Sequence, residues 1–468
     1  MAWQRRGKSR TIGLAIAVAA VVLLTILLCI FKTRHASGTT VRTPPAVFAV
    51  FYTCDTRGHI EPCGCTSGMA GGISRRQTFL AKARRRDFLL VDAGDVTAGP
   101  RPWEILELEY ILKGYEEMGY HAVNVGHREM SMSFEALQKL EEHCSRFVSA
   151  NVFGPDGQLV FEPFRVVEFS NGYRCGIIGV ADDGVPSESI GDGLSIAPAA
   201  DAIAKHLPEL KKKSDFIVLL AFADKPAMAE LARQFFEVDV IVGGKVQQAS
   251  NELIKENQSV IVYNTDKGKS VGQLDILPVS EGDWSYTNDF TLLAESMKMD
   301  ARVAAFVEEY KLQLKERDFN PVKDDEEGLS SISASRSKDA DKYIGSESCV
   351  ACHKTAHRLW AESAHASAFE ALEREGNQYN PRCLKCHTVG YMASDGYINQ
   401  KLTPKLKNIG CESCHGRGDH HVKLMSMQEV PVKQVIMKNT ACTECHDKDN
   451  SPNFDEDKYW EMITHGKE

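Results

Sequence analysis

The feature that most constrains this chain is a motif that recurs four times in its last quarter. Cys-x-x-Cys-His occurs at Cys349–His353, Cys383–His387, Cys411–His415 and Cys442–His446. Two thiols at this spacing can add to the two vinyl groups of a haem, and the adjacent histidine then becomes the proximal iron ligand. A single motif is also compatible with half of a zinc site or with a redox pair. Four copies, each with its histidine, predict four covalently bound haems.

The motifs assign a role to twelve residues. Thioether attachment is predicted for Cys349, Cys352, Cys383, Cys386, Cys411, Cys414, Cys442 and Cys445, and proximal coordination for His353, His387, His415 and His446. Four haems are large relative to the protein segment around them. We therefore expect them to form much of its core, and the segment not to fold without them.

The same stretch contains histidines that could bind iron from the opposite side. His357, His365, His420, His421 and His465 lie outside the motifs. An electron-transfer haem usually has a second axial ligand, and histidine is the expected one here.

Three runs in this stretch are distinctive. They are Cys349-Val-Ala-Cys-His353 with Trp360 and Ser363-Ala-His365-Ala, then Cys383-Leu-Lys-Cys-His387-Thr-Val-Gly-Tyr391, then Gly410-Cys411-Glu-Ser-Cys-His415-Gly. Together they resemble the tetrahaem cytochrome c-554 family. The resemblance implies a mainly helical domain with closely stacked haems that pass electrons. It implies His365 as one distal ligand, His420 or His421 as a second, and His465 as a third.

A fourth distal ligand is harder to find. His420 and His421 are neighbours and are not expected to reach two irons. His357 lies four residues beyond His353 on a predicted helix, so the two imidazoles cannot bind opposite faces of one haem. We therefore predict one haem without a strong distal ligand, and the family resemblance implies that it is the haem of His387. If every haem has a sixth ligand, His357 is the remaining candidate.

The N-terminus predicts a membrane anchor. Arg5, Arg6, Lys8 and Arg10 precede an uncharged apolar run from Ile12 to Phe31. About twenty such residues can cross a bilayer as a helix, and the basic flank stays in the cytoplasm. We predict a cytoplasmic tail at 1–10, a single transmembrane helix at 11–31 and a linker at 32–45, with the rest on the periplasmic side of a bacterial membrane. A cleaved signal peptide is the alternative.

The middle of the chain alternates short apolar runs with helix-like segments. The predicted strands are 47–52, 88–91, 122–125, 175–180, 216–221 and 238–242, and the predicted helices are 73–85, 103–118, 134–143, 199–212 and 225–236. This alternation predicts an α/β domain, with helices on both sides of a sheet, over 46–320. A long amphipathic helix is predicted near 289–315. A polar, flexible linker follows at 321–341 and the cytochrome domain at 342–468.

Five segments at predicted strand ends suggest a second family. They are Thr53-Cys-Asp55, Asp92-Ala-Gly-Asp95, Gly126-His-Arg-Glu129, Ser149-Ala-Asn151 and Gly243-Gly-Lys-Val-Gln247. Over about 46–314 the chain resembles the 5′-nucleotidase-like calcineurin-type metallophosphatases. These enzymes hold two metals with Asp, Asn and His, and the metals activate water and bind the phosphate oxygens.

The ligand positions depart from that family. Arg57 replaces the histidine of Asp-x-His, Lys245 replaces that of Gly-Gly-His, and Phe222 stands where another histidine would follow a strand. Of the ligands in these motifs only Asp55 and Asp95 remain, and His127 is displaced within Gly126-His-Arg-Glu129. Positive side chains at metal positions oppose cation binding. We therefore predict no second metal besides haem iron and no phosphatase activity.

Two cysteines follow the first predicted strand. Cys63 and Cys65 lie in His59-Ile-Glu-Pro-Cys-Gly-Cys65, which looks like the signature of an exported metallophosphatase-like branch with the same ligand losses. Closely spaced thiols can bind a soft metal or act as a redox pair, and Arg57, Arg75 and Arg76 would favour the thiolate form. An inert disulfide or free thiols are the alternative.

These observations support three candidate functions. The favoured one is a membrane-tethered electron carrier whose α/β domain docks or regulates redox partner proteins. The second is a reductase of a small nitrogen or sulfur compound, acting at an open haem or at Cys63 and Cys65. The third is a phosphoesterase with an altered metal site. The mild net charge of −9, without long charged blocks, does not suggest nucleic acid as a partner.

Overall fold

The structure is a computed structural model. It describes residues 42–62, 69–84, 87–265, 267–280, 283–320, 341–427, 441–448, 450–451 and 453–465. The predicted anchor at 11–31, Cys63 and Cys65, and nearly all of the predicted linker 321–341 lie outside the described residues. Among the helices of the described ranges, none is long and apolar enough to cross a membrane.

The α/β part contains two six-stranded sheets. The first has the order β14-β13-β1-β2-β3-β4. Its strands are β1 (Phe48–Thr53), β2 (Phe88–Asp92), β3 (Ala122–Asn124), β4 (Phe147–Val148), β13 (Ser270–Ser280) and β14 (Asp283–Leu292). β1 to β4 run parallel, and β13 pairs antiparallel with β1. All six residues of β1 are buried, as expected for a strand covered on both faces.

The second sheet has the order β11-β12-β10-β9-β7-β6. Its strands are β6 (Phe164–Glu168), β7 (Arg174–Ala181), β9 (Phe216–Phe222), β10 (Val240–Gly243), β11 (Ile254–Glu256) and β12 (Ser259–Tyr263). The central strands β7, β9, β10 and β12 are parallel. A two-stranded ribbon of β5 (Val152–Phe153) and β8 (Ser195–Ile196) lies outside both sheets.

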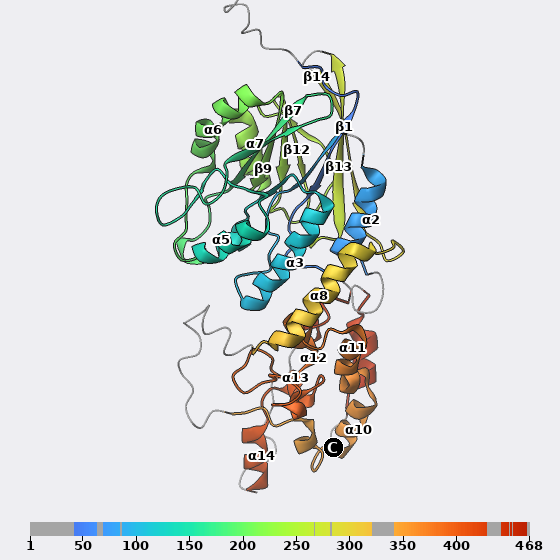
Figure 1. Cartoon of the computed structure of the whole chain (residues 1–468). Coiled ribbons are helices and arrows are strands. Elements are labelled where there is room, and N and C mark those ends of the chain that lie inside the picture. The colour runs from blue at the N-terminus through green and yellow to red at the C-terminus, as the bar shows by residue number, and fades with distance from the viewer. Residues whose placement is uncertain are drawn as a thin grey trace, which may run out of the picture. The chain divides into compact units, whose positions relative to one another are not determined.

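The two sheets pack face to face between helices. Phe48 of the first sheet meets Phe216 of the second, with ring centroids 5.2 Å apart. Helices α2 (Ile73–Ala83), α3 (Pro102–Met118) and α8 (Ala301–Arg317) cover the first sheet, and α6 (Ala199–Lys213) and α7 (Lys225–Gln234) cover the second (Figure 1). Short α4 (His127–Met130) and α5 (Phe134–His143) follow β3. The predicted α/β sandwich is therefore present, with two sheets.

The predicted start of the helix near 289–315 is too early in the chain. Residues 283–292 form β14, which pairs antiparallel with β13 from Ser270 opposite Leu292 to Ser280 opposite Asp283. The helix starts after Asp300, whose carboxylate accepts the N–H groups of Arg302 and Val303. The prediction was wrong because β14 gains its order from pairing with β13, whereas the helical pattern downstream is local.

The described residues from 341 onward form short helices and 3-10 turns. The helices are α10 (Lys354–Glu362), α11 (Ala368–Glu375), α12 (Pro381–His387), α13 (Cys411–His415), α14 (Asp419–Ser426) and α15 (Glu456–Ile463). Their own apolar core is small and consists of Phe369, Leu372, Leu384, Val389, Tyr391, Tyr397 and Leu406.

Candidate functional site

The C-terminal helices leave apolar surface for a large cofactor. None of the residues of α10, α14 and α15 is buried. In α15, Tyr459, Trp460 and Met462 are 42%, 48% and 68% exposed. None of the eight motif cysteines forms a disulfide, and none is buried. Accessible thiols and exposed apolar side chains in the same part of the chain fit covalent haem attachment.

The four motifs contact one another in a definite order. The thiol of Cys349 lies beside that of Cys411, and the thiol of Cys386 lies beside that of Cys445. Cys414 lies close enough to Cys442 for their charges to interact. The first motif is therefore next to the third, the third next to the fourth, and the fourth next to the second.

Three proximal histidines face a second histidine. Ring centroids are 6.1 Å apart for His353 and His421, 6.1 Å for His446 and His365, and 5.7 Å for His415 and His465. A metal–imidazole bond is about 2 Å long and the ring adds roughly 1 Å on each side, so two imidazoles that share one metal have centroids about 6 Å apart. The three pairs therefore have the spacing of two axial ligands on one iron.

His387 of the second motif is different. Its Nδ1 lies 2.7 Å from the carbonyl oxygen of Ala368, which orients the ring and leaves Nε2 for a metal. Within the described ranges, the His387 ring contacts no other histidine ring. His357 lies elsewhere, with Nε2 3.5 Å from a carboxylate oxygen of Glu347 and its ring beside Trp360.

Glu412 is a buried carboxylate between the cysteines of the third motif, and sequence reasoning missed it. It is 3% exposed. Its oxygens accept the backbone N–H groups of Ile344 at 3.0 Å, Gly345 at 2.7 Å and Gly418 at 2.9 Å. Gly345 precedes the first motif, and Gly418 caps α14, which carries His421. Glu412 thus ties the third motif to both histidines of the first pair.

The carboxyl ends of the strands in the α/β part hold a second polar cluster. Asp55, Arg57, Asp95 and Lys245 all adopt a left-handed backbone, with φ between 47° and 57°. This conformation costs a non-glycine residue about 1 kcal/mol or more, and such residues concentrate at functional sites. The loops that follow β1, β2 and β10 therefore hold non-glycine residues in an energetically unfavourable backbone conformation.

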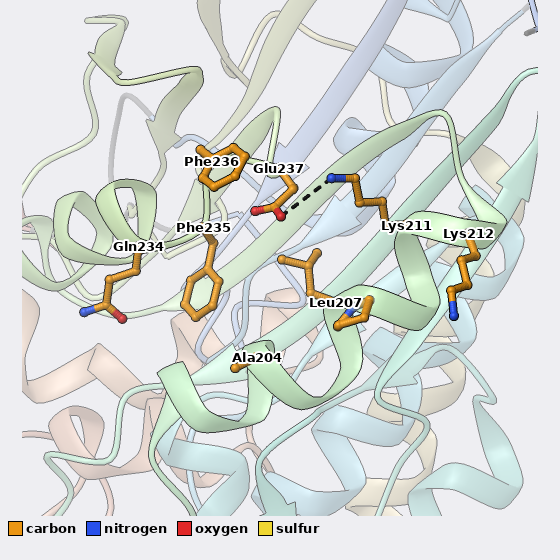
Figure 2. A pocket seen from close by; sticks show the side chains of 9 residues that line it. Ala204, Leu207, Lys211, Lys212, Gln234, Phe235, Phe236 and Glu237 are labelled. Atoms are coloured by element: carbon orange, nitrogen blue, oxygen red, sulfur yellow. Dashed lines mark ion pairs between the residues drawn. The ribbon is translucent and has the colours of Figure 1, made fainter.

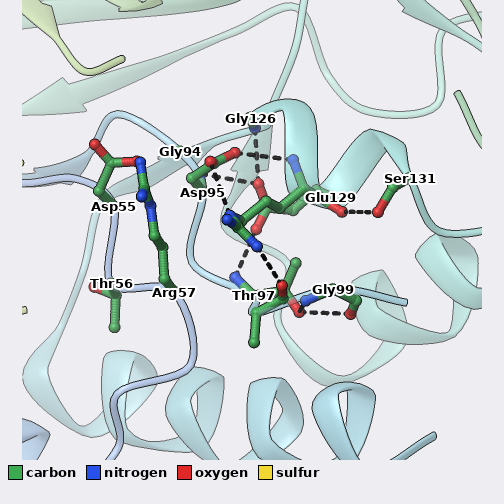
Figure 3. Close-up of polar contacts among 12 residues, drawn as sticks. Asp55, Thr56, Arg57, Gly94, Asp95, Thr97, Gly99, Gly126, Glu129 and Ser131 are labelled. Atoms are coloured by element: carbon green, nitrogen blue, oxygen red, sulfur yellow. Dashed lines mark hydrogen bonds and ion pairs between the residues drawn. The ribbon is translucent and has the colours of Figure 1, made fainter. Parts of the chain in front are cut away.

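Three carboxylates of this cluster, those of Asp55, Asp95 and Asp182, are each paired with a cation. Arg57 donates to Asp55 from Nε at 3.1 Å and from Nη2 at 2.9 Å (Figure 3). The Nε of Arg128 is 3.4 Å from Asp95, and the Nζ of Lys245 is 2.6 Å from Asp182. The side chains at the departing family positions thus neutralise the remaining acids.

His127 also turns to Asp182, a residue that the sequence did not single out. Its Nε2 is 3.3 Å from a carboxylate oxygen of Asp182, and its ring stands edge-on to Phe222 at 5.0 Å. Asp182 follows β7, so only the adjacency of β7 and β9 in the second sheet brings it here.

Burial raises the pKa of two acids of the cluster, Asp95 and Glu129. Burial, with the nearby charge of Glu129, raises the pKa of Asp95 to about 7. Glu129 accepts the N–H groups of Asp95, Thr97 and Gly126 (Figure 3). One oxygen of Asp55 is buried without a hydrogen-bond partner. In the part of the chain that the structure describes, no group of three or more His, Cys, Asp or Glu side chains is arranged to hold a metal.

The arginines near Cys63 and Cys65 have other partners. Arg76 is fully buried and donates to the hydroxyl groups of Tyr115, Tyr120 and Thr56. Arg57 is paired with Asp55, and Arg75 donates to the carbonyl of Met69. Cys63 and Cys65 lie outside the described residues, so the expectation that Arg57, Arg75 and Arg76 favour their thiolate form stays a prediction.

A surface pocket lies away from both sites. Leu207 and Phe235, from α6 and the end of α7, form its apolar part, and Lys211 and Glu237 pair at 3.6 Å on its rim (Figure 2). None of the predicted site residues lines it, so it does not enter the functional argument.

Comparisons with known proteins identify a relative of the C-terminal part. The family described as "Cytochrome c554 and c-prime" matches residues 348–416. Cytochrome c-554 of Nitrosomonas europaea is 29% identical in an alignment 149 residues long, which covers 25% of this chain and 63% of that protein. The predicted resemblance to this family is confirmed.

The α/β part is similar to 5′-nucleotidases, as predicted. The 5′-nucleotidase of Vibrio cholerae is 26% identical in an alignment 247 residues long, which covers 44% of this chain and 44% of that protein. A 5′-nucleotidase precursor from Thermus thermophilus has a TM-score of 0.51 at 24% identity and covers 58% of this chain and 59% of its own. Sulfate thiohydrolase SoxB from the same organism has a TM-score of 0.52 at 16% identity, and the match covers 60% of this chain and 63% of that protein. The chain spans less than two thirds of each of these relatives, and the structural likeness shows the fold alone.

Proposed function

We propose that this protein is a periplasmic electron carrier with four covalent haems. It is tethered to the membrane by residues 11–31, and its metallophosphatase-like domain does not hydrolyse phosphoesters. The observation that carries the proposal is the set of three histidine pairs at about 6 Å, the separation of two axial ligands on one iron. The haems, when bound, supply one-electron transfer.

Each histidine pair has a defined role in this proposal. His353 and His421 hold the first haem, His415 and His465 the third, and His446 and His365 the fourth. The contacts between motif cysteines support the order first, third, fourth, second for electron passage. The redox donor and acceptor proteins bind at the two ends of this series.

A second candidate function rests on His387. Its ring has a fixed orientation and no opposite histidine among the described residues. A haem held there has an open axial position, where a small nitrogen or sulfur compound can bind and be reduced with electrons from the other haems. The α/β part then serves for docking, because Arg57, Arg128 and Lys245 compete with cations for the remaining carboxylates. A redox role for Cys63 and Cys65 stays a prediction.

The test combines mass spectrometry and spectroscopy of the full-length holoprotein. The intact mass should contain four haem additions, and two or three would contradict the count. Electron paramagnetic resonance should show three low-spin irons and one high-spin iron, and the reduced protein should bind carbon monoxide. A wholly low-spin spectrum without a carbon monoxide shift would exclude the open axial position and leave electron transfer as the only proposed function. A high-spin signal newly created by His357→Ala would then identify His357 as the fourth distal ligand.

A further inference from the structure

A side chain next to the second motif contacts the α/β part. Arg382 directly precedes Cys383. Its Nη2 donates to a carboxylate oxygen of Glu107 on α3 at 2.7 Å and to the carbonyl oxygen of Arg57 at 3.1 Å. One guanidinium therefore connects a haem-attachment site to α3 and to the loop after β1.

The ion pair of Arg382 and Glu107 packs directly against Gly58. Gly58 has a φ of 72°. A Cβ at this position would lie 2.1 Å from the Glu107 carboxylate and 2.4 Å from Nη2 of Arg382. The Glu107 side chain is 5% exposed, whereas that of Arg382 is 37% exposed. Glycine is therefore required both by the backbone conformation and by the space that the ion pair occupies.

Neighbouring contacts hold the same region in register. Lys311 of α8 is 2.7 Å from Glu61 and donates to the carbonyl of Glu375 at 3.0 Å. Asn399 donates to Asp318 at 2.9 Å. Tyr379 and Met392 pack against the core of the α/β part. Arg382 is therefore one element of an ordered interface.

The Glu107 carboxyl titrates near neutral pH. Burial raises its pKa to about 7, and Arg382 opposes this increase. The other ionisable groups that surround the pair come from α3, the loop after β1, and α8. They are Glu104, His59, Glu61, Tyr310 and Lys311. The pKa of His59 is lowered to about 3 by burial, so this imidazole is neutral near pH 7.

We propose that Glu107 and Arg382 form a proton-linked pair that sets the potential of the haem bound at the second motif. When the redox donor protein supplies one electron that reduces this iron from ferric to ferrous, the Glu107 carboxylate takes up one proton from the solvent. The added electron makes the haem more negative by one charge. Protonation of Glu107 turns the neutral pair into a net cation close to the Cys383 attachment point, which compensates that charge. This inference rests on the proposed function, which places a haem at Cys383, Cys386 and His387.

The test is a potentiometric titration of the full-length holoprotein between pH 6 and pH 8.5, followed by the high-spin paramagnetic signal. In the wild type, the midpoint potential of the second haem should fall as pH rises, by at most about 59 mV for each tenfold drop in proton concentration. Glu107→Gln keeps a neutral group at all pH values, so its potential should match the wild-type value at low pH and vary little with pH. A pH-independent wild-type potential, or an unchanged slope in Glu107→Gln, overturns the proposal.

Glu104→Gln is the matched control. Glu104 lies on the same helix and influences Glu107, but the hydrogen bonds of Arg382 described above go to Glu107 and Arg57, and glutamine can still accept the N–H of Arg101 as Glu104 does. Glu104→Gln should keep the wild-type slope of midpoint potential against pH, within a pH range that moves slightly downward because the charge of Glu104 raises the pKa of Glu107. If Glu107→Gln fails to acquire four haems, Arg382→Met tests the same pair. Loss of the cation should move the pH-dependent range upward, and an unmoved range refutes the pairing.

Failure of the proposed function is distinguishable from failure of this inference. Carbon monoxide binding tests the open axial position, whereas the slope of the midpoint potential against pH tests the proton link. If all haems are low-spin, the titration is followed optically for all four. A pH-dependent component that disappears in Glu107→Gln then still supports the pair.

Discussion

Replacing Glu412 with glutamine should release the distal ligand of the first haem. The carboxylate accepts three backbone N–H groups at 2.7–3.0 Å in a site that is 3% exposed. Glutamine retains only one acceptor oxygen, so at least one of the donors from Ile344, Gly345 and Gly418 loses its partner. A hydrogen bond to a charged group contributes about 1.5–3 kcal/mol and a buried orphan donor costs a further 1–3 kcal/mol, so the expected loss is about 3–5 kcal/mol.

One carboxylate oxygen accepts the N–H of Gly418 and the other that of Gly345, so this loss falls on the start of α14 when the amide nitrogen of glutamine faces Gly418. Gly418 caps that helix, and His421 lies three residues beyond it. About 3 kcal/mol corresponds to a change of more than a hundredfold in an equilibrium between docked and undocked helix. Glu412→Gln should therefore add about one high-spin iron per chain while the intact mass still contains four haems.

The matched control is Ser413→Ala, the other residue between the same two cysteines. The Ser413 hydroxyl is buried without a hydrogen-bond partner, so its removal should leave the spectrum unchanged. Electron paramagnetic resonance and thermal unfolding of both variants provide the comparison. A Glu412→Gln spectrum identical to the wild type, with a loss of stability below about 1 kcal/mol, would refute the positioning role.

Three further predictions concern the α/β part. Arg76→Leu should destabilise it by about 3–5 kcal/mol, measured by thermal unfolding, because it removes the cation from beside the fully buried Asp92. Wild-type protein supplied with manganese, cobalt or zinc should not hydrolyse nucleotides, and metal-dependent turnover that disappears in Asp95→Ala would contradict this expectation. Burial raises the pKa of Asp239 to about 7 from an unfolded value of about 3.9, so its contribution to stability is complete at low pH and is lost as pH rises through about 7. Asp239→Asn, which can still accept the N–H of Ile217, should melt at the wild-type temperature near pH 4 and about 2–8 °C higher at pH 8; equal melting temperatures at both pH values would contradict this sign.

Some features of the protein could be predicted from the sequence because they depend on local spacing. Cys-x-x-Cys-His places two thiols and an imidazole within one turn of chain, so each motif predicts haem attachment without reference to any distant residue. The replacement of two metal-ligand histidines of the family by Arg57 and Lys245 is equally visible in the sequence. The strand and helix pattern predicted the α/β sandwich, but it missed β14, whose order depends on pairing with β13.

Only the tertiary structure decided which distant groups meet. His421 faces His353 across 68 positions of chain and His446 faces His365 across 81, and nothing in the spacing of histidines distinguishes His421 from His420 for this purpose. The same is true of Glu412 beneath α14 and of Arg382 against Glu107. Each of these contacts requires separate segments to pack at a set distance and orientation. Packing of that kind depends on the shape and burial of the whole core, whereas covalent attachment of a haem depends on five consecutive residues.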